Sequence, residues 1–314
     1  MQGINTIAAL AAAVSRKHSM FRLGHARLGR KAGLMLAAIA AGLALSLPAH
    51  ADNPNKGKMF KVAADVGLVP FFMRGTDGKM DGFSNDLTQE VAQRMGYDGA
   101  EVIDTPFSAI FAGLFSSRYD MVAAPTNTTQ ERAQQMLFAE PYMAGGLSFL
   151  AKKGATVNSL EDLKDKTIAV NNGSFSDRWL QENQEKYGYK IQRFNKNTDA
   201  VQAVAIGRAF ANMSETPLAR YIATKTPALA PVYDMTTEAN YAFAFRKDDT
   251  ALRNRVDEVL ECMKQDGSLS KLHVKWFGTE PNAGTAMTVV FPGYGAPDFP
   301  GYEPTEHTPD CSRT

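Results

Sequence analysis

The sequence predicts an α/β protein built in two similar halves, each with a mainly parallel β-sheet and covering helices. From Met59 onward, short strand-like runs alternate with segments that have helical apolar spacing. Strands separated by helices of this length indicate βαβ units, in which the strands lie parallel. A second series begins at Thr167, beyond a crossing point over 141–146 that contains two glycines. We therefore expect two lobes with a cleft between them.

Each predicted element follows from the apolar pattern and from the turn residues around it. The first half has predicted strands over 60–65, 100–104 and 119–124, and predicted helices over 86–95 and 107–115. The second half has predicted strands over 167–170, 190–194, 210–213, 228–233 and 241–245, and predicted helices over 176–187, 199–206 and 217–224. An amphipathic region over 252–276 follows, which Gly267 breaks into two helices. From Asn282 the abundance of Gly and Pro predicts an irregular tail.

The stretch from Ala123 to Arg132 suits the binding of a carboxylate. It contains a strand end, a turn at Pro125 and Thr129, which starts a stretch that can be helical. Such a turn aims backbone N–H groups, hydroxyls and one guanidinium at a single volume, and an arginine can grip a carboxylate through two hydrogen bonds. The turn at 171–174 has the matching position in the second half. An ordinary helix N-cap with a surface arginine is the alternative.

The first 51 residues have the features of a cleaved secretory signal peptide. Their basic residues end at Lys31, an apolar run follows over 32–47, and Ala49–Ala51 fits a cleavage site. The run is short for a membrane span, although an uncleaved anchor helix is the alternative. No cysteine near the cleavage site offers a lipid anchor, and either Met1 or Met20 can be the start. We expect a freely soluble exported protein, which favours the periplasm.

Charge and cysteine content narrow the expected partners and cofactors. Without the first 51 residues, 28 basic residues face 33 acidic ones, a net charge of about −5 that disfavours nucleic acid and anionic membranes. Export permits a disulfide between the only two cysteines, Cys262 and Cys311, with two free thiols as the alternative. A disulfide that closes a loop of about 50 residues stabilises a fold by roughly 4 kcal/mol. His273 and His307 lack ligand spacing, so we expect no metal site, and we expect no cofactor.

Several short motifs follow one another in a fixed order between Met59 and Gly278. They are Asp65 with Pro70–Phe71, Gly78–Phe83 with Asp86–Leu87, Thr129 and Arg132 with Phe138–Tyr142, Ser159–Leu163, Asp266–Gly267 and Lys275–Gly278. In this order they resemble the extracytoplasmic solute-binding proteins of ABC importers, in the polar amino acid branch (family 3). The resemblance implies the periplasmic binding protein type II fold, with two doubly wound sheets joined by a two-strand hinge. Residues 58–143 and 240–278 would form lobe 1, 144–239 lobe 2, and 279–314 an irregular C-terminal tail, after a signal peptide at 1–51.

The resemblance also implies which residues hold the ligand's charged groups. Arg132 would bind the α-carboxylate, assisted by Asn127 and Ser174, although turn or cap chemistry is the alternative for those two. The family usually has a second hydroxyl after that serine, where this chain has Phe175. Glu215 would bind the α-amine in place of the family's aspartate, which is one methylene shorter. A solvated glutamate before the next helix is the alternative.

Three further residues correspond to the pocket for the ligand's side chain. Family members often hold this side chain between two aromatic faces, and the corresponding positions are Leu68 and Phe107. Leucine offers no ring face for cation–π attraction, which tilts the expectation away from a strongly cation-selective site. Asp65 near the same wall still allows a polar or basic side chain. A core role for Phe107 and a strand-end cap for Asp65 are the alternatives.

The expected function is a periplasmic receptor rather than an enzyme. It would be a monomer that captures an amino acid or a similar small zwitterion and delivers it to the permease subunits of an ABC importer. One alternative is a periplasmic dehydratase of the cyclohexadienyl type, acting on prephenate or arogenate. Relatives of that kind add an acid three residues after the amine-binding carboxylate, and this chain has Leu218 there. Another alternative is a ligand sensor without transport.

Overall fold

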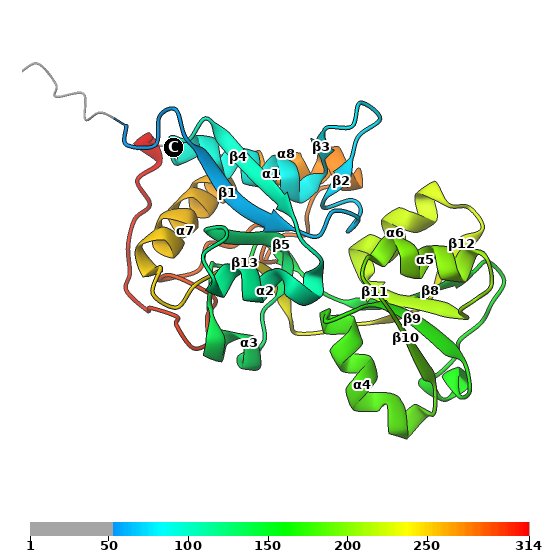
Figure 1. The fold of residues 1–314 in the computed structure, drawn as a ribbon. Coiled ribbons are helices and arrows are strands. Elements are labelled where there is room, and N and C mark those ends of the chain that lie inside the picture. The colour runs from blue at the N-terminus through cyan, green and yellow to red at the C-terminus, as the bar shows by residue number, and fades with distance from the viewer. Residues whose placement is uncertain (1–52, 314) are drawn as a thin grey trace, which may run out of the picture. The chain divides into compact units, whose positions relative to one another are not determined.

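The computed structural model describes residues 53–313, and its first sheet has six strands (Figure 1). The strand order is β4-β1-β5-β13-β6, with β7 paired to β13. Strand β1 is parallel to both β4 and β5, and β13 is antiparallel to β5, β6 and β7. The strands are β1 (Met59–Ala64), β4 (Gly99–Asp104), β5 (Met121–Asn127), β6 (Leu137–Phe138), β7 (Met143–Ala144) and β13 (Asn240–Phe245).

The second sheet has five strands in the order β10-β9-β11-β8-β12. Strand β9 is parallel to β10 and β11, whereas β8 is antiparallel to β11 and β12. The strands are β8 (Leu147–Lys152), β9 (Thr167–Asn171), β10 (Lys190–Phe194), β11 (Ala211–Glu215) and β12 (Leu229–Met235). A separate two-stranded ribbon is formed by β2 (Met73–Arg74) and β3 (Met80–Asp81).

The helices fall into two sets along the chain, one with each sheet. The first sheet goes with α1 (Phe83–Arg94), α2 (Phe107–Phe115), α3 (Gln130–Gln135), α7 (Thr250–Gln265) and α8 (Ser268–Phe277). The second goes with the short helix η1 (Leu160–Leu163), α4 (Phe175–Tyr187), α5 (Asn197–Ala205) and α6 (Thr216–Lys225). A last short helix, η2, spans Cys311–Arg313.

Helices cover both faces of the second sheet because side chains alternate along its strands. On β9, Ile168 and Val170 belong to the core that includes Leu180 of α4. Ala169 between them belongs to the core that includes Ala203 of α5. Successive side chains of a strand point to opposite faces, so one buried strand supplies two hydrophobic layers. This arrangement leaves the strand ends, rather than the faces, free to form a site.

The chain passes between the sheets twice, which confirms the predicted fold of two doubly wound sheets joined by two connecting segments. The first passage follows β7 through Gly145 and Gly146, and the second runs over 236–239 between β12 and β13. A side chain at Gly145 would clash with the carbonyl oxygen of Ala239, so the two passages lie against each other there. Glycine is needed at that position because the two backbones approach closely.

Strand β5 is longer than the sequence pattern predicts. The predicted strand ends at Ala124, whereas the observed strand continues through Pro125 to Asn127. The register between β5 and β13 shifts between Ala242 and Ala244, and this irregularity accommodates a residue without a backbone N–H group. Asn127 is therefore the last strand residue rather than part of a following turn. Strand β8 was not predicted, although its first five residues are buried.

The predicted irregular tail packs along one polar face of α7. That face carries four ionisable side chains at helical spacing, none more than 9% exposed: Arg253, Asp257, Glu261 and Lys264. The tail partners three of them directly through backbone groups: Arg253 donates to Gly301 O (2.8 Å), Gly295 N to Asp257, and Lys264 to Val289 O (2.9 Å). The tail therefore completes the burial of groups that α7 supplies.

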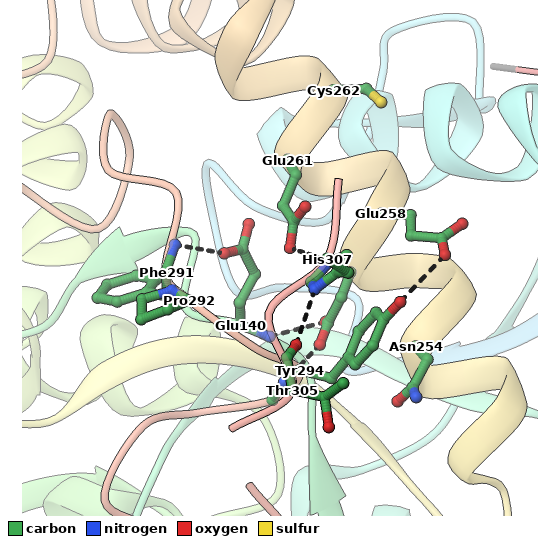
Figure 2. Close-up of polar contacts among 12 residues, drawn as sticks. Glu140, Asn254, Glu258, Glu261, Cys262, Phe291, Pro292, Tyr294, Thr305 and His307 are labelled. Atoms are coloured by element: carbon green, nitrogen blue, oxygen red, sulfur yellow. Dashed lines mark hydrogen bonds and ion pairs between the residues drawn. The ribbon is translucent and has the colours of Figure 1, made fainter. Parts of the chain in front are cut away.

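The end of the tail reaches Glu261 (Figure 2). His307 Nε2 lies 3.0 Å from Glu261 Oε1, and the imidazole stacks on the Tyr294 ring with centroids 3.8 Å apart. Burial, reinforced by the neighbouring Glu140 and Asp257 carboxyls, raises the pKa of Glu261 to about 8. The next residue, Cys262, lies at disulfide distance from Cys311, with Cα atoms 5.6 Å apart. Two adjacent residues of α7 therefore fix the end of the tail.

The predicted signal peptide at 1–51 lies outside the residues that the structure describes. Within 53–313, no helix combines the length and the apolar character needed to cross a membrane.

Candidate functional site

A small cavity of about 10 Å³ lies where the carboxyl ends of strands from both sheets meet. In open α/β sheets, ligands bind beyond these strand ends. The residues that line it come from the segments after β1 and β4, from the end of β5 and from the second sheet: Leu68, Phe107, Pro125, Asn127, Asn171, Ser174, Phe175, Ser176, Asn197, Met213, Ser214, Glu215 and Leu218. Both sheets therefore contribute to one enclosed site.

Five of the seven residues predicted to contact a ligand line this cavity. They are Leu68, Phe107, Asn127, Ser174 and Glu215. The remaining two, Arg132 and Asp65, do not line it, but each contacts residues that do. The structure thus brings together side chains that are as far apart in the sequence as Asp65 and Glu215.

Arg132 lies directly behind the wall formed by Asn127 and Phe107. The helix N-cap that was the alternative is present, since the Thr129 hydroxyl accepts from Arg132 N at 3.2 Å at the start of α3. Arg132 Nη1 donates to Asn127 O at 3.0 Å, and the guanidinium lies 5.6 Å from the centroid of the Phe107 ring. Desolvation lowers the pKa of Arg132 to about 10, against the opposing effect of the Glu215 carboxylate. At neutral pH the guanidinium remains a partly desolvated cation.

Glu215 supplies the opposite charge from the second sheet. It ends β11 and occupies the N-cap position of α6, with Pro217 in the first turn of the helix. Asn127 Nδ2 lies 3.4 Å from Glu215 Oε1, a contact that joins the two sheets. Burial raises the pKa of Glu215, whereas the backbone hydrogen bond and the Arg132 guanidinium lower it. Glu215 therefore lines the cavity, and the Arg132 guanidinium lies behind its wall and interacts with the Glu215 carboxyl.

Ser174 is a helix cap as well as a cavity residue. Its Oγ accepts from Asp177 N at 3.0 Å at the start of α4. Asp177 in turn accepts from Gly173 N at 3.0 Å, which fixes the turn before the helix. The cap uses the hydroxyl oxygen as an acceptor, so the O–H hydrogen can still be donated. The cap chemistry that was the alternative for Ser174 is therefore present.

Asp65 is fully buried, and the protein itself satisfies its carboxylate. Its Oδ1 lies 2.9 Å from Lys196 Nζ. Its Oδ2 accepts from Asn171 Nδ2 at 3.0 Å and from Phe107 N at 3.2 Å. Lys196 Nζ also lies 2.6 Å from Asp104 Oδ1. The sequence pattern did not indicate Lys196, because only the approach of the two sheets places it beside Asp65.

A larger and more open hollow of about 930 Å³ lies between α6 and the end of α8. Its basic lining residues include Arg220 and Lys275, whose charges are paired with Asp234 and Asp86 at 2.8 and 2.7 Å. The smaller cavity lies at the strand ends, with Glu215 in its lining and Arg132 behind its wall, so it is the stronger candidate for a ligand site.

Comparisons with known proteins agree on one family. The family model of bacterial extracellular solute-binding proteins, family 3, matches residues 60–279. The L-cystine-binding protein TcyJ of Escherichia coli is 30% identical over 263 residues, covering 81% of this chain and 98% of that protein.

Solved structures give the same result for the fold. An ancestral arginine-binding protein bound to arginine has a TM-score of 0.67 and 30% identity, covering 71% of this chain and 99% of that chain. An ancestral amino acid-binding protein that is a precursor of cyclohexadienyl dehydratase has a TM-score of 0.63 and 32% identity, covering 71% of this chain and 95% of that chain.

Proposed function

Because the chain belongs to the bacterial extracellular solute-binding proteins, family 3, we propose that its cavity captures an amino acid or a similar small zwitterion for an ABC importer. The observation that carries this proposal is the pair of interacting, oppositely charged side chains at one cavity: Glu215 lines it, and Arg132 contacts its wall at Asn127. A zwitterion presents a carboxylate and an ammonium close together, which matches this pair. The family and its named relatives are binding proteins rather than enzymes.

In the proposed complex, each charged group of the ligand has its own partners. Arg132 binds the carboxylate, with the Asn127 amide and the Ser174 hydroxyl as additional donors. Glu215 accepts from the ammonium. Both charges are partly or fully withdrawn from water, so a complementary ligand charge interacts more strongly with them than it would at a surface. Leu68 and Phe107 provide apolar contacts for the ligand's side chain.

Capture requires the two lobes to separate and close again. A cavity of about 10 Å³ holds about one water molecule and is too small for an amino acid. We therefore infer that ligand enters when lobe 1 (58–143 and 240–278) moves away from lobe 2 (144–239) about the two passages near Gly145 and Ala239. Hinge closure of this kind is common in binding proteins.

We further propose a periplasmic monomer that is exported by its N-terminal 51 residues and delivers ligand to importer permease subunits. In that compartment the Cys262–Cys311 pair forms a disulfide. Mass spectrometry of protein purified from the periplasm, with and without reduction, tests both inferences. An N-terminus at Asp52 and a mass increase of two hydrogens on reduction are expected.

Calorimetry with the exported protein tests the proposed site. At least one α-amino acid is expected to bind, and Arg132→Ala is expected to weaken it by about 2–5 kcal/mol, because the ligand carboxylate loses its charged partner. Arg220→Ala is the matched control, since Arg220 pairs with the surface residue Asp234. Unchanged affinity in Arg132→Ala would reject the assignment of the carboxylate site.

A further inference from the structure

Lys196, one residue before α5, does not line the cavity, but it places a positive charge beside Asp65, which contacts the cavity residues Phe107 and Asn171. Its ammonium lies between two carboxylates of the first sheet, 2.9 Å from Asp65 Oδ1 and 2.6 Å from Asp104 Oδ1. The Asp65 side chain is fully buried, and the Lys196 side chain is 25% exposed. The contact therefore joins a cation of the second sheet to a carboxylate inside the first.

Asp65 lies immediately behind the cavity wall. Phe107 and Asn171 both line the cavity, and both donate to Asp65 Oδ2, through the Phe107 backbone N–H and the Asn171 side-chain amide. With Lys196 on Oδ1, both carboxylate oxygens have partners, and the charge is compensated within the protein. A carboxylate whose charge is already compensated attracts a second cation only weakly.

A ligand with a cationic side chain beside Phe107 would bring a second positive charge toward Asp65, which Lys196 already neutralises. Burial opposes the charged form of Lys196, but its bonds to Asp104 and Asp65 leave its pKa raised, so it stays protonated at neutral pH. Two cations held close together repel each other, and displacing Lys196 would break two short contacts. A neutral side chain meets no such cost and packs against Leu68, Phe107 and Met213.

We propose that Lys196 determines ligand specificity: it serves as an internal counter-ion for Asp65 and excludes amino acids with a cationic side chain. The cavity then selects amino acids with a neutral side chain, which deepens the proposed function and rests on it. Rejection by a like charge is an effective way to separate ligands of similar shape. The assigned class differs from that of the similar ancestral protein whose structure holds arginine.

The test compares ligand pairs that match in shape and differ in charge. L-arginine is paired with L-citrulline, and L-ornithine with L-norleucine, in competition calorimetry on the exported protein. The unmodified protein is expected to bind the neutral member of each pair at least about tenfold more tightly, because close like charges disfavour binding. Lys196→Met is expected to reverse or abolish this preference, since Asp65 and Asp104 then lack their cation. Lys196→Arg retains the positive charge and is expected to keep the preference for the neutral ligand of each pair.

Arg178→Met is the matched control. Arg178 of α4 pairs with Glu131 of α3, so it also joins the two sheets, but neither residue touches Asp65. Arg178→Met can lower the affinity for all ligands equally, and it is expected to leave the ratio of the affinities for the cationic and the neutral ligand of each pair unchanged. Thermal unfolding of each variant confirms that it is folded.

Three outcomes separate this inference from the function on which it rests. If neutral amino acids bind but the ratio is the same in the unmodified protein and in Lys196→Met, the inference fails and amino acid capture stands. If the unmodified protein prefers arginine to citrulline, the inference fails in the same way. If no α-amino acid binds any of these proteins, the proposed function fails and the inference with it.

Discussion

At the scale of single residues, the site depends on charges whose surroundings fix their state. Glu215 is half-buried, and its pKa is raised mainly because desolvation disfavours the ionised form. Arg132 opposes that effect and has a pKa of about 10. Each charge therefore partly compensates the other, and the proposed zwitterion would supply a further partner to both. This arrangement makes both residues sensitive to substitution.

Glu215→Gln is expected to weaken amino acid binding by about 2–5 kcal/mol, because the ligand ammonium then lacks a charged partner inside the closed cavity. The substitution keeps the shape of the side chain and an oxygen that can accept hydrogen bonds. Calorimetry with the tightest-binding amino acid measures the effect. Equal affinity in the variant would mean that Glu215 does not bind the amine.

At the scale of elements, the C-terminal tail and α7 form one unit. The tail lies beyond residue 279, where the family match ends, yet it partners the buried face of α7. Glu261 is the most informative group there, because its pKa of about 8 lies far above its ordinary value of 4.5. The groups around it are Glu140, Asp257, Glu258 and Lys264, with His307 from the tail.

The raised pKa of Glu261 gives a signed prediction for stability against pH. Between about pH 4.5 and pH 8, the folded protein binds more protons at Glu261 than the unfolded chain does. The contribution of Glu261 to the free energy of unfolding therefore falls as pH rises from about 4.5 to about 8, and it is constant above pH 8. Urea unfolding of the unmodified protein and of Glu261→Gln at several pH values isolates the effect. The variant is expected to lose stability less steeply, and identical profiles would contradict the assignment.

At the scale of the whole molecule, the two sheets meet through polar contacts around the cavity. Asn127 reaches Glu215, Asn171 and Lys196 reach Asp65, and Arg178 reaches Glu131. These contacts are of the kind that opening breaks and closure restores. The two chain passages near Gly145 connect the sheets by backbone, so their close approach sets the geometry in which Asn127 and Glu215 meet.

Gly145→Ala is expected to destabilise the protein by about 1–3 kcal/mol, because its Cβ would overlap the Ala239 carbonyl and approach Asn127 Oδ1 to 2.9 Å. Ligand affinity should fall as well, since Asn127 lines the cavity. Gly146→Ala is the matched control, because its Cβ meets the Thr216 Oγ1 atom at 2.9 Å, where a rotatable side chain can move. Urea unfolding and calorimetry measure both effects, and equal losses in the two variants would contradict the argument.

The sequence predicted most elements because local patterns specify them. Alternating runs and caps gave every strand of four residues or more except β8, and the helices α1, α2, α4, α5, α6, α7 and α8, usually within a few residues. Strand β8 was not predicted, because its apolar residues follow directly after Gly146 at the crossing point, without a separate turn between them. The end of β5 was wrong because proline normally stops a strand, and only the register shift against β13 accommodates Pro125.

The sequence by itself determined the two α/β halves, because hydrophobic periodicity is a local property of a chain. The order of its motifs indicated the candidate ligand residues through the resemblance to a known family. Five of the seven predicted ligand residues line the cavity. Only the tertiary structure decided that Lys196 neutralises Asp65 and that the tail buries the polar face of α7. These pairings join residues more than a hundred positions apart in one case and about fifty in the other. No local pattern encodes such contacts, since they exist only once the sheets and the tail have packed together.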